Sequence, residues 1–501
     1  MAEDPNIKDY ASTCEVKQIA LYKVGEEDKP YVNLIGMAMT MQYHEDIFWP
    51  SYGATITVVD NQENIISTMP IEGFEKVVAE FEDVEGNQYT YNFRVWSINN
   101  RITRERRNTY TLGLISEQGL LNEGIRVNRT IKGNTSVEVG KILMDYFQIP
   151  AEMVDAEESA TNIVLLPTKK TPFNVIRSLA PKTISKHAGT VAAEKAKPET
   201  KVVRKAYDSK RGTKYKNVTV KTDINTELTA KATGTAGYLF FQTREKFIFR
   251  SIDNLVDNGE KFGGKPPVNM TKNKEGKIVP DPFFMQAGKV GQPTRKKIQE
   301  INFGKELNLM KKMREGAYSS ICCFYNINTG EYSEQIYSLA NMWSNMAHLG
   351  SKTELPAGQE SLSNYPSRVM SSIISHENWY MGTGVASNDD KDGGKGDNSF
   401  PDWQKNFLTQ SNSRLGILFN QELTISVTGH LELCAGDKVE VRIPNQVPDE
   451  DKEEVWDPEH SGTYLIKKLN HQFNIPGKSV YTVLELIRDS YGIKDSESNV
   501  A

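Results

Sequence analysis

One hairpin-forming pattern occurs twice in this chain, and it constrains the fold more than any other feature of the sequence. The stretch INNRITRERRNTYTLGLIS, residues 98–116, aligns without a gap with LNHQFNIPGKSVYTVLELI, residues 469–487. Any two amphipathic hairpins share alternating apolar residues. Equal length and a matching Tyr-Thr pair favour a duplicated β module instead. The matched pairs, at a constant offset of 371 (469 − 98), are Ile98/Leu469, Asn99/Asn470, Ile102/Phe473, Tyr110/Tyr481 and Thr111/Thr482.

The segment that contains the second hairpin, Leu423–Tyr491, has the residue pattern of a compact antiparallel β unit. Apolar and polar residues alternate from Leu423 to Val427 and again from Val439 to Ile443, and glycines separate the runs. This period of two, bounded by turn residues, is typical of half-buried strands.

Several phrases in this segment and upstream of it carry a family resemblance. They are GHLELCAGDKVEVRIP, SGTYLIKKLNHQF and YTVLELIRDSYG near the end, GYLFFQTREKFIFRSIDNL, LLPTKKTPFNVIRSLAPK, and MPIEGFEKVVAEF in the first module. In this order along the chain they resemble the baseplate hub subunit of contractile-tailed bacteriophages. The hub part of type VI secretion spike proteins, or of a phage-like injection device, shares that architecture and is the first alternative.

The resemblance implies a non-enzymatic structural protein of the virion, assembled in the host cytoplasm. In that family three subunits form a ring whose six similar β modules adapt a six-fold tail tube to a three-fold central spike, and DNA crosses the ring only in transit. The implied partners are two further copies of the chain, a tail tube or tube-initiator protein, a spike or needle, a tape-measure protein and baseplate wedge proteins.

At 501 residues the chain is too long to fold around a single hydrophobic core. We expect a mainly β protein with α+β parts, in which two similar antiparallel β modules are joined to smaller α+β domains. The expected divisions are a first β module at 1–116; an α+β domain at 117–256; a linker and irregular or helical region at 257–420, which holds the start of the second module at about 317–340; closing strands at 421–492; and a flexible tail at 493–501.

Four helices are expected between the modules, one of them after a strand within Lys296–Arg314. Asn134 and Thr135 precede one with Val137, Ile142 and Leu143 on its apolar face, and Thr171-Pro172 opens another. A third would place Trp403, Phe407, Ser411, Leu415 and Leu418 on one face.

A lysine-rich segment interrupts the α+β domain at about 183–234. Lys182–Gly234 holds 13 Lys plus Arg against 5 Asp plus Glu and few large apolar residues. We expect a partly mobile surface insertion, with docking to an acidic partner or to nucleic acid as the sharper alternative. A second basic run, Arg101–Arg107, lies at the tip of the first hairpin, where it is either a solvated tip or a contact with an acidic neighbouring subunit.

Composition narrows the function classes. The formal net charge of −5 argues against phosphate recognition as the main source of affinity. No apolar run approaches the ~18 residues of a membrane span, and no secretory leader is expected. The four cysteines, Cys14, Cys322, Cys323 and Cys434, contain no C-x-x-C and are expected to be reduced and structural.

No catalytic, cofactor-binding or metal-binding residue can be assigned from the sequence. Gly477-Lys478-Ser479 lacks the first glycine of a phosphate loop and is expected to be a turn. Residues 388–399 open like an EF-hand, but Ser399 replaces its bidentate glutamate. The seven histidines show no zinc-hydrolase spacing. They are His44, His187, His348, His376, His430, His460 and His471.

A tail-associated cell-wall hydrolase is the alternative from another class. Its two carboxylates need to be only about 5 to 10 Å apart in space, so counting acidic residues does not exclude it. No local sequence singles out such a pair.

Overall fold

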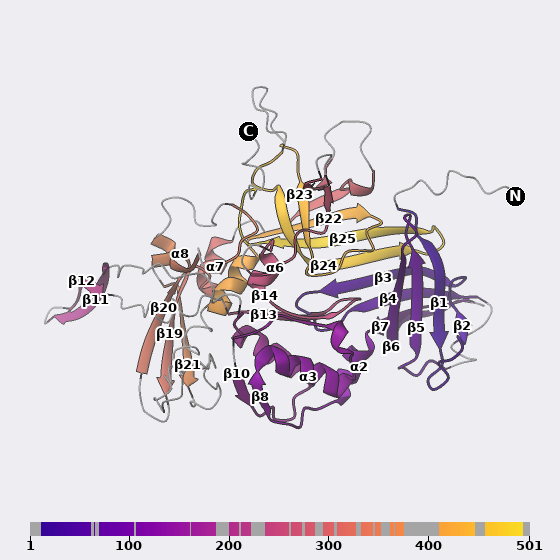
Figure 1. The fold of residues 1–501 in the computed structure, drawn as a ribbon, viewed down its shortest axis with the longest axis horizontal. Coiled ribbons are helices and arrows are strands. Elements are labelled where there is room, and N and C mark those ends of the chain that lie inside the picture. The colour runs from indigo at the N-terminus through magenta and orange to yellow at the C-terminus, as the bar shows by residue number, and fades with distance from the viewer. Residues whose placement is uncertain are drawn as a thin grey trace.

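The computed structural model describes most of the chain. The described residues are 12–61, 65, 70–104, 107–160, 162–186, 200–209, 212–221, 236–259, 262–272, 276–285, 294–304, 308–326, 332–343, 346–351, 361–364, 366–374, 410–445 and 456–493. As predicted, the fold is mainly β with α+β parts (Figure 1).

A 13-stranded sheet forms the centre of the described structure, and its first half comes from the N-terminal region. Strands β4 and β7 pair, β7 pairs with β6, and β6 pairs with β5, all antiparallel, while β3 lies on the free side of β4. We call β3 to β7 the first unit. Two further strands, β1 and β2, extend it beyond β5. The bounds are β1 Glu15–Tyr22, β2 Val32–Asn33, β3 Ala38–Asp46, β4 Gly53–Asp60, β5 Lys76–Glu82, β6 Gln88–Arg104 and β7 Arg107–Ile115.

The C-terminal region repeats the same pattern of pairing. β22 pairs with β25, β25 with β24, and β24 with β23, all antiparallel, and β18 lies on the free side of β22. We call these five strands the second unit. A two-residue strand, β17, adds to β23 in parallel. The bounds are β17 Phe283–Phe284, β18 Glu300–Phe303, β22 Gln421–Thr428, β23 Lys438–Arg442, β24 Gly462–Asn474 and β25 Ser479–Arg488.

The two units join edge to edge through β3 and β24. Seven residue pairs, from Lys468↔Asp46 to Asn474↔Thr40, connect them in antiparallel register. A single hydrophobic core then runs under both units and includes Tyr43, Phe81, Leu112, Ile425 and Phe473. In Figure 1, the indigo-to-purple strands β3 to β7 form the first unit, and the orange-to-yellow strands β22 to β25 belong to the second.

The outgoing strands of the two hairpins share a bulge at the predicted offset. Trp96 is the extra residue in β6 and Lys467 is the extra residue in β24, again 371 positions apart. A bulge in the same place of two hairpins is an observation that periodicity alone does not provide.

The return strands do not keep that offset. A second irregularity in β6, between Asn99 and Ile102, shifts β7 by one residue, and Asn100 there has a left-handed φ of 54°. Because one residue moves a side chain to the other face of a sheet, Tyr110 is buried while Tyr481 is 38% exposed. The predicted equivalence of Tyr110 with Tyr481, and of Thr111 with Thr482, is therefore wrong.

Residues 317–340 do not begin the second unit as predicted. They contain β19 (Ser319–Asn326) and β20 (Tyr332–Ser338), which form a separate sheet with β21 (Arg368–Ile374). The place beside β22 is taken by the shorter β18. The sequence pattern led to the wrong assignment because β19 and β20 form a hairpin, which a local pattern predicts well. β18 has only four residues, too few for a comparable signal.

Three short helices lie in this inserted region: α7 (Leu309–Glu315), α8 (Leu339–Met342) and α9 (Ser361–Asn364). A further helix covers residues 410–418 of the described chain. Its predicted apolar face is only partly correct, since Leu415 is 38% exposed and Arg414 is fully buried. Arg414 is held by Asp489 at 2.9 Å and Asp253 at 3.0 Å. Trp403 and Phe407 lie outside the described residues.

An α+β region, which lies between the two units in the sequence, has its own hydrophobic core. Asn134 caps α3, and Pro172 occupies the first turn of α4, as the sequence predicts. Val137, expected on the apolar face of α3, is 52% exposed instead. The elements are α2 Glu117–Gly124, β8 Ile131–Asn134, α3 Thr135–Phe147, η2 Ala151–Met153, β9 Val154–Ala156, β10 Asn162–Leu165, α4 Pro172–Leu179, η3 Ala180–Lys182, β13 Tyr238–Gln242, β14 Phe247–Ser251 and α6 Ile252–Val256.

The lysine-rich insertion contains a hairpin of β11 (Thr200–Ser209) and β12 (Gly212–Lys221), which pair only with each other. Regular strands were not expected there. Smaller elements follow: β15 Met270–Lys272, β16 Ile278–Pro280 and η5 Thr294–Lys296. None of the helices in the described part of the chain has the length and apolar character of a membrane span.

Candidate assembly surfaces

The segments whose sequence suggested possible chemistry have structural roles where they are described. Gly477-Lys478-Ser479 is the tight turn that joins β24 to β25, with Lys478 at φ 47° and Gly477 N–H donating to Asn474 Oδ1 at 3.1 Å. Residues 388–399 lie outside the described residues. Within the ranges given above, no three His, Cys, Asp or Glu side chains come together as metal ligands would.

Histidines pair with nearby carboxylates or hydroxyls rather than with one another. Nδ1 of His348, His430 and His460 lies 2.7 to 3.0 Å from a carboxylate oxygen of Asp489, Glu432 and Asp457, respectively. His471 Nδ1 lies 2.9 Å from Thr482 Oγ1, and burial lowers the pKa of this histidine to about 3. His44 lies on the exposed face of β3, and His187 and His376 lie outside the described residues.

The described cysteines are free thiols. Burial is the main cause that raises the pKa of Cys14 to about 12 and that of Cys322 to about 11. Because the thiolate is the reactive form, these two cysteines are poor nucleophiles.

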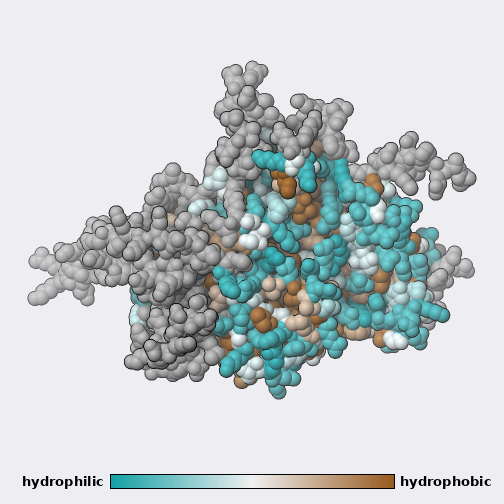
Figure 2. Space-filling view, in the orientation of Figure 1, coloured by the Kyte–Doolittle hydropathy of each residue, from teal (hydrophilic) through white to brown (hydrophobic). Residues whose placement is uncertain are grey.

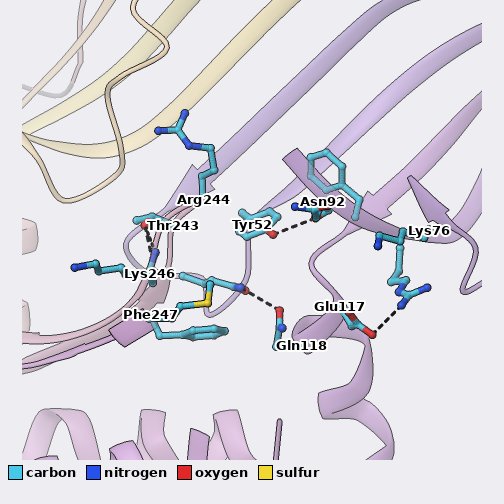
Figure 3. Close-up of a pocket in the computed structure, with 13 residues that line it drawn as sticks. Tyr52, Lys76, Asn92, Glu117, Gln118, Thr243, Arg244, Lys246 and Phe247 are labelled. Atoms are coloured by element: carbon cyan, nitrogen blue, oxygen red, sulfur yellow. Dashed lines mark hydrogen bonds and ion pairs between the residues drawn. The ribbon is translucent and has the colours of Figure 1, made fainter. Parts of the chain in front are cut away.

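A small cavity lies where the first unit meets the α+β region (Figure 3). Its volume is about 200 Å³, below the roughly 300–1,000 Å³ of typical ligand sites. Arg94 is one of the lining residues, and it is paired with Glu27 and Glu117. The cavity lining thus consists largely of satisfied contacts between domains. The lining residues are Tyr52, Lys76, Asn92, Phe93, Arg94, Glu117, Gln118, Met153, Gln242, Thr243, Arg244, Lys246 and Phe247.

Glu45 connects three parts of the molecule at one buried carboxylate. It accepts hydrogen bonds from Tyr43 Oη at 2.5 Å, from the backbone N–H of Arg244 at 2.7 Å and from that of Ala435 at 2.7 Å. Burial is the main cause that raises the pKa of Glu45 to about 7. Because Arg244 lies in the β13–β14 turn and Ala435 between β22 and β23, Glu45 fixes both to the core side of β3.

The tip of the second hairpin is covered by the first unit. Beyond the Lys467 bulge, β24 turns from β23 to β3 as its partner. Phe473 is 2% exposed, and its ring stacks on Phe81 with 3.9 Å between ring centroids.

The tip of the first hairpin has no such cover within the described chain. Residues 98–104 of β6 lie beyond the Trp96 bulge and pair only with β7. Ile102, the counterpart of Phe473, is 53% exposed. An exposed strand edge with an apolar side chain is a template for pairing with another strand.

The opposite end of the sheet also carries a free edge. β18 pairs with β22 on one side, and no strand in the described ranges pairs with its other side. β18 holds in the second unit the place that β3 holds in the first. Met41 of β3 continues a row through Ile56 and Leu112 to Ile98, and Ile301 of β18 continues the matching row through Ile425 and Leu484 to Leu469.

Sequence reasoning found Ile102 and Phe473 as a pair but missed that their surroundings differ. It also predicted a strand followed by a helix near 296–314 without assigning that strand to the second unit. The signal that identifies β18 is the alternation in EINF, which is too short to be recognised without its partner β22.

Comparisons with known proteins complete these observations. No protein-family description and no curated protein sequence matches the chain. Among solved structures, it is similar to a tail protein of Neisseria meningitidis MC58, at 12% identity and a TM-score of 0.47 over 96% of this chain and 97% of that one.

It is also similar to the 43 kDa tail protein of prophage MuSo2 from Shewanella oneidensis, at 10% identity and a TM-score of 0.44 over 94% and 98% of the two chains. A third similar structure is an Escherichia coli type VI secretion component that is itself described as similar to bacteriophage T4 tail proteins; identity is 9% and the TM-score 0.36 over 96% and 78%. The solved structures that this chain resembles are therefore phage tail proteins and proteins related to type VI secretion spikes.

Proposed function

We propose that this protein is the structural hub of a phage tail baseplate. Three copies form a ring that lines a DNA channel and adapts a six-fold tail tube to a three-fold central spike. The order of hub-like sequence phrases supports the class of protein. The duplicated unit supports the symmetry, because three chains with two similar units each offer six similar positions.

The observation that carries the proposal is the contrast between the two hairpin tips. Within one chain, β3 covers the tip of β24 and buries Phe473. The tip of β6 has the same kind of edge and leaves Ile102 exposed. In a ring, β18 of a neighbouring copy covers β6 as β3 covers β24, since β18 and β3 hold equivalent places.

Side-chain chemistry fits this pairing. With the internal β3–β24 register as the guide, Ile301 of one copy lies opposite Ile102 of the next, as Met41 lies opposite Phe473. The exposed Glu300 then lies close to the basic hairpin tip with Arg101 and Arg104. The basic run thus acquires an acidic neighbour, one of the two roles that its sequence suggests.

Ring size is consistent with a channel. The path from β18 to β6 contributes eight strands per chain, so three chains give 24. At about 4.8 Å between strands the circumference is about 115 Å and the radius about 18 Å, and strand tilt increases both. A central opening of this width admits a double helix once side chains are added.

The proposal assigns no enzymatic activity, and it assigns no cofactor or metal. The proposed partners are the tail tube or tube initiator, the spike, the tape-measure protein and the wedge proteins, in a virion assembled in the host cytoplasm. A hub in a type VI secretion or phage-like injection device remains the first alternative. The domain divisions at 116, 256 and 420 also remain predictions.

The test is Ile102→Lys. A lysine at 102 places a charge in the proposed strand pairing without disturbing a buried side chain, so the subunit should fold while the trimer dissociates. Sedimentation velocity and native mass spectrometry should give trimers for the wild type and monomers for the variant. Val84→Lys is the matched control, because Val84 is 44% exposed in the β5–β6 turn, and it should stay trimeric.

Two outcomes contradict the proposal. One is a wild-type chain that stays monomeric both alone and in the presence of the spike. The other is an Ile102→Lys variant that forms trimers as stable as those of the wild type. Zymography on bacterial cell wall tests the hydrolase: clearing that one Asp or Glu substitution abolishes would favour that alternative.

A further inference from the structure

The face of the large sheet opposite its core is unusual in carrying rows of uncharged polar side chains. One row spans all seven strands from β22 to β6, a second runs from β25 to β6, and a third runs from β22 to β4. These stretches contain no Asp, Glu, Lys or Arg, although 25% of the chain is charged; the third row is bounded by Glu300 beyond Ser426 and by Ile115 and Arg94 beyond Gly53. The rows are Thr428–Tyr481–Gln472–Gln42–Thr55–Gly113–Ser97, Ser479–Asn474–Thr40–Thr57–Thr111–Asn99 and Ser426–Val483–Asn470–His44–Gly53.

Solvent reaches most of this face. Gln42, Thr40, Asn99 and Asn474 are exposed, and Thr55, Thr57 and Thr111 are half-buried. We call these three rows the neutral face. Figure 2 shows that hydrophilic residues (teal) cover much of the coloured surface of the molecule in that view.

Charges lie at the borders of the neutral face. Along one border Lys468 lies between Glu485, which it pairs with at 3.4 Å, and Asp46, its partner residue on β3. Glu300 on β18 and Arg101 near the tip of β6 mark the two ends. In the proposed ring these two ends meet, so their charges also face each other.

Ring closure decides which side of the sheet faces the channel, and this step rests on the proposed function. The core shared by the two units and the β13–β14 turn held through Glu45 lie on the core side of the sheet. A barrel of about 18 Å radius has no room for them inside. The neutral face is therefore the inner wall.

We propose that the neutral face is a passage surface that neither binds nor repels a polyanion, here the duplex DNA of the proposed channel. Lysine or arginine on the wall would bind phosphates and release counterions, and so retain the DNA. Aspartate or glutamate would raise an electrostatic barrier to entry. Threonine, asparagine and glutamine keep a hydrated surface, and the β-branched Thr40, Thr57 and Thr111 form a stiff cross-strand row.

The test adds charge to the wall and leaves the rest of the ring unchanged. The variant Gln42→Lys/Thr55→Lys/Thr57→Lys places three lysines per chain on the neutral face. The control variant Thr130→Lys/Val137→Lys/Met144→Lys adds the same charge at exposed positions of the α+β region. Gln42→Lys alone, at an exposed position, is the second variant in case the triple variant does not fold.

Two measurements separate the outcomes. Fluorescence anisotropy with a 30-base-pair duplex at 150 mM salt should give binding at least about tenfold tighter for the wall variant than for the wild type and the control. Single rings seated in a solid-state nanopore should hold passing duplex DNA at least about tenfold longer when they carry the wall lysines.

Equal dwell times for wild-type, wall-variant and control rings would overturn this inference while leaving the ring intact. Wild-type rings that bind the duplex as tightly as the wall variant would overturn it as well. Failure of the wild type to form rings is a different result, which contradicts the proposed function itself.

Discussion

The hairpin tips of β6 and β24 share a strand order and a bulge position but have different surroundings. β24 finds β3 in the same chain, and Phe473 enters the common core. Beyond Trp96, β6 pairs only with β7 in the described chain, and Ile102, the counterpart of Phe473, stays in solvent. A duplicated unit therefore keeps an unpaired edge when only one of its two copies has a neighbouring strand within the described chain.

The bulge residues differ for a related reason. Lys467 lies over the ring of Phe419 at 5.4 Å and pairs with Glu485 at 3.3 Å. Phe419 belongs to the long insertion between β18 and β22, whereas only residues 47–52 connect β3 with β4. Trp96 has no such cover among the described residues and is 58% exposed. Insertions therefore decide whether equivalent positions are buried.

The largest expected effect distinguishes the two tips directly. Phe473→Ala should destabilise the subunit by about 3–5 kcal/mol, because it leaves a cavity against Phe81. Ile102→Ala should change the stability of the isolated subunit by less than about 0.5 kcal/mol, because Ile102 is exposed there. Urea unfolding of both variants at a concentration that keeps the chain monomeric measures the contrast. Similar losses for the two variants would mean that the tips are equally buried.

A second prediction concerns the pH dependence of stability that His471 causes. The counterpart of His471 in the first hairpin is the exposed Asn100. Burial lowers the pKa of His471 to about 3, so the unfolded chain binds a proton below pH 6.5 that the folded chain does not. The contribution of His471 to stability is present above pH 6.5 and is lost as the pH falls toward 3, by at most about 1.4 kcal/mol per pH unit.

His471→Asn, which introduces the residue of the first hairpin, should remove this part of the pH dependence. Thermal or urea unfolding of wild type and variant between pH 4 and 8 gives the difference. If the two profiles stay parallel over the whole range, His471 does not titrate as a buried neutral group.

The smallest effect should come from removing a segment that neither unit uses. β11 and β12 pair only with each other, and Ile184 and Ala236, which flank the insertion, already form a bridge. Deleting residues 188–233 and joining the ends with a short Gly-Ser linker should change stability by no more than about 0.5 kcal/mol, because loop closure depends weakly on length. Circular dichroism and sedimentation should match the wild type; aggregation would assign the insertion to a core.

Local sequence pattern by itself determined much of this fold. The mainly β class, the long hairpins, the Asn134 cap of α3, the Pro172 start of α4 and the Gly477 turn all follow from periodicity and backbone preferences over a few residues. The alignment at an offset of 371 correctly matched Ile98 with Leu469 and Ile102 with Phe473, because the alternation of apolar and polar side chains along a strand is visible in the sequence.

Tertiary structure alone decided the rest. The register shift at Asn100 placed Tyr110 and Tyr481 on opposite faces of the sheet. The alternation of apolar and polar residues does not predict where a single irregular residue interrupts a strand. The choice of β18 over the 317–340 hairpin as a partner of β22 depended on pairing across more than 100 residues. Whether Ile102 is a core or a surface residue depends on which strand covers β6, and a sequence pattern specifies the edge of a strand without specifying what fills it.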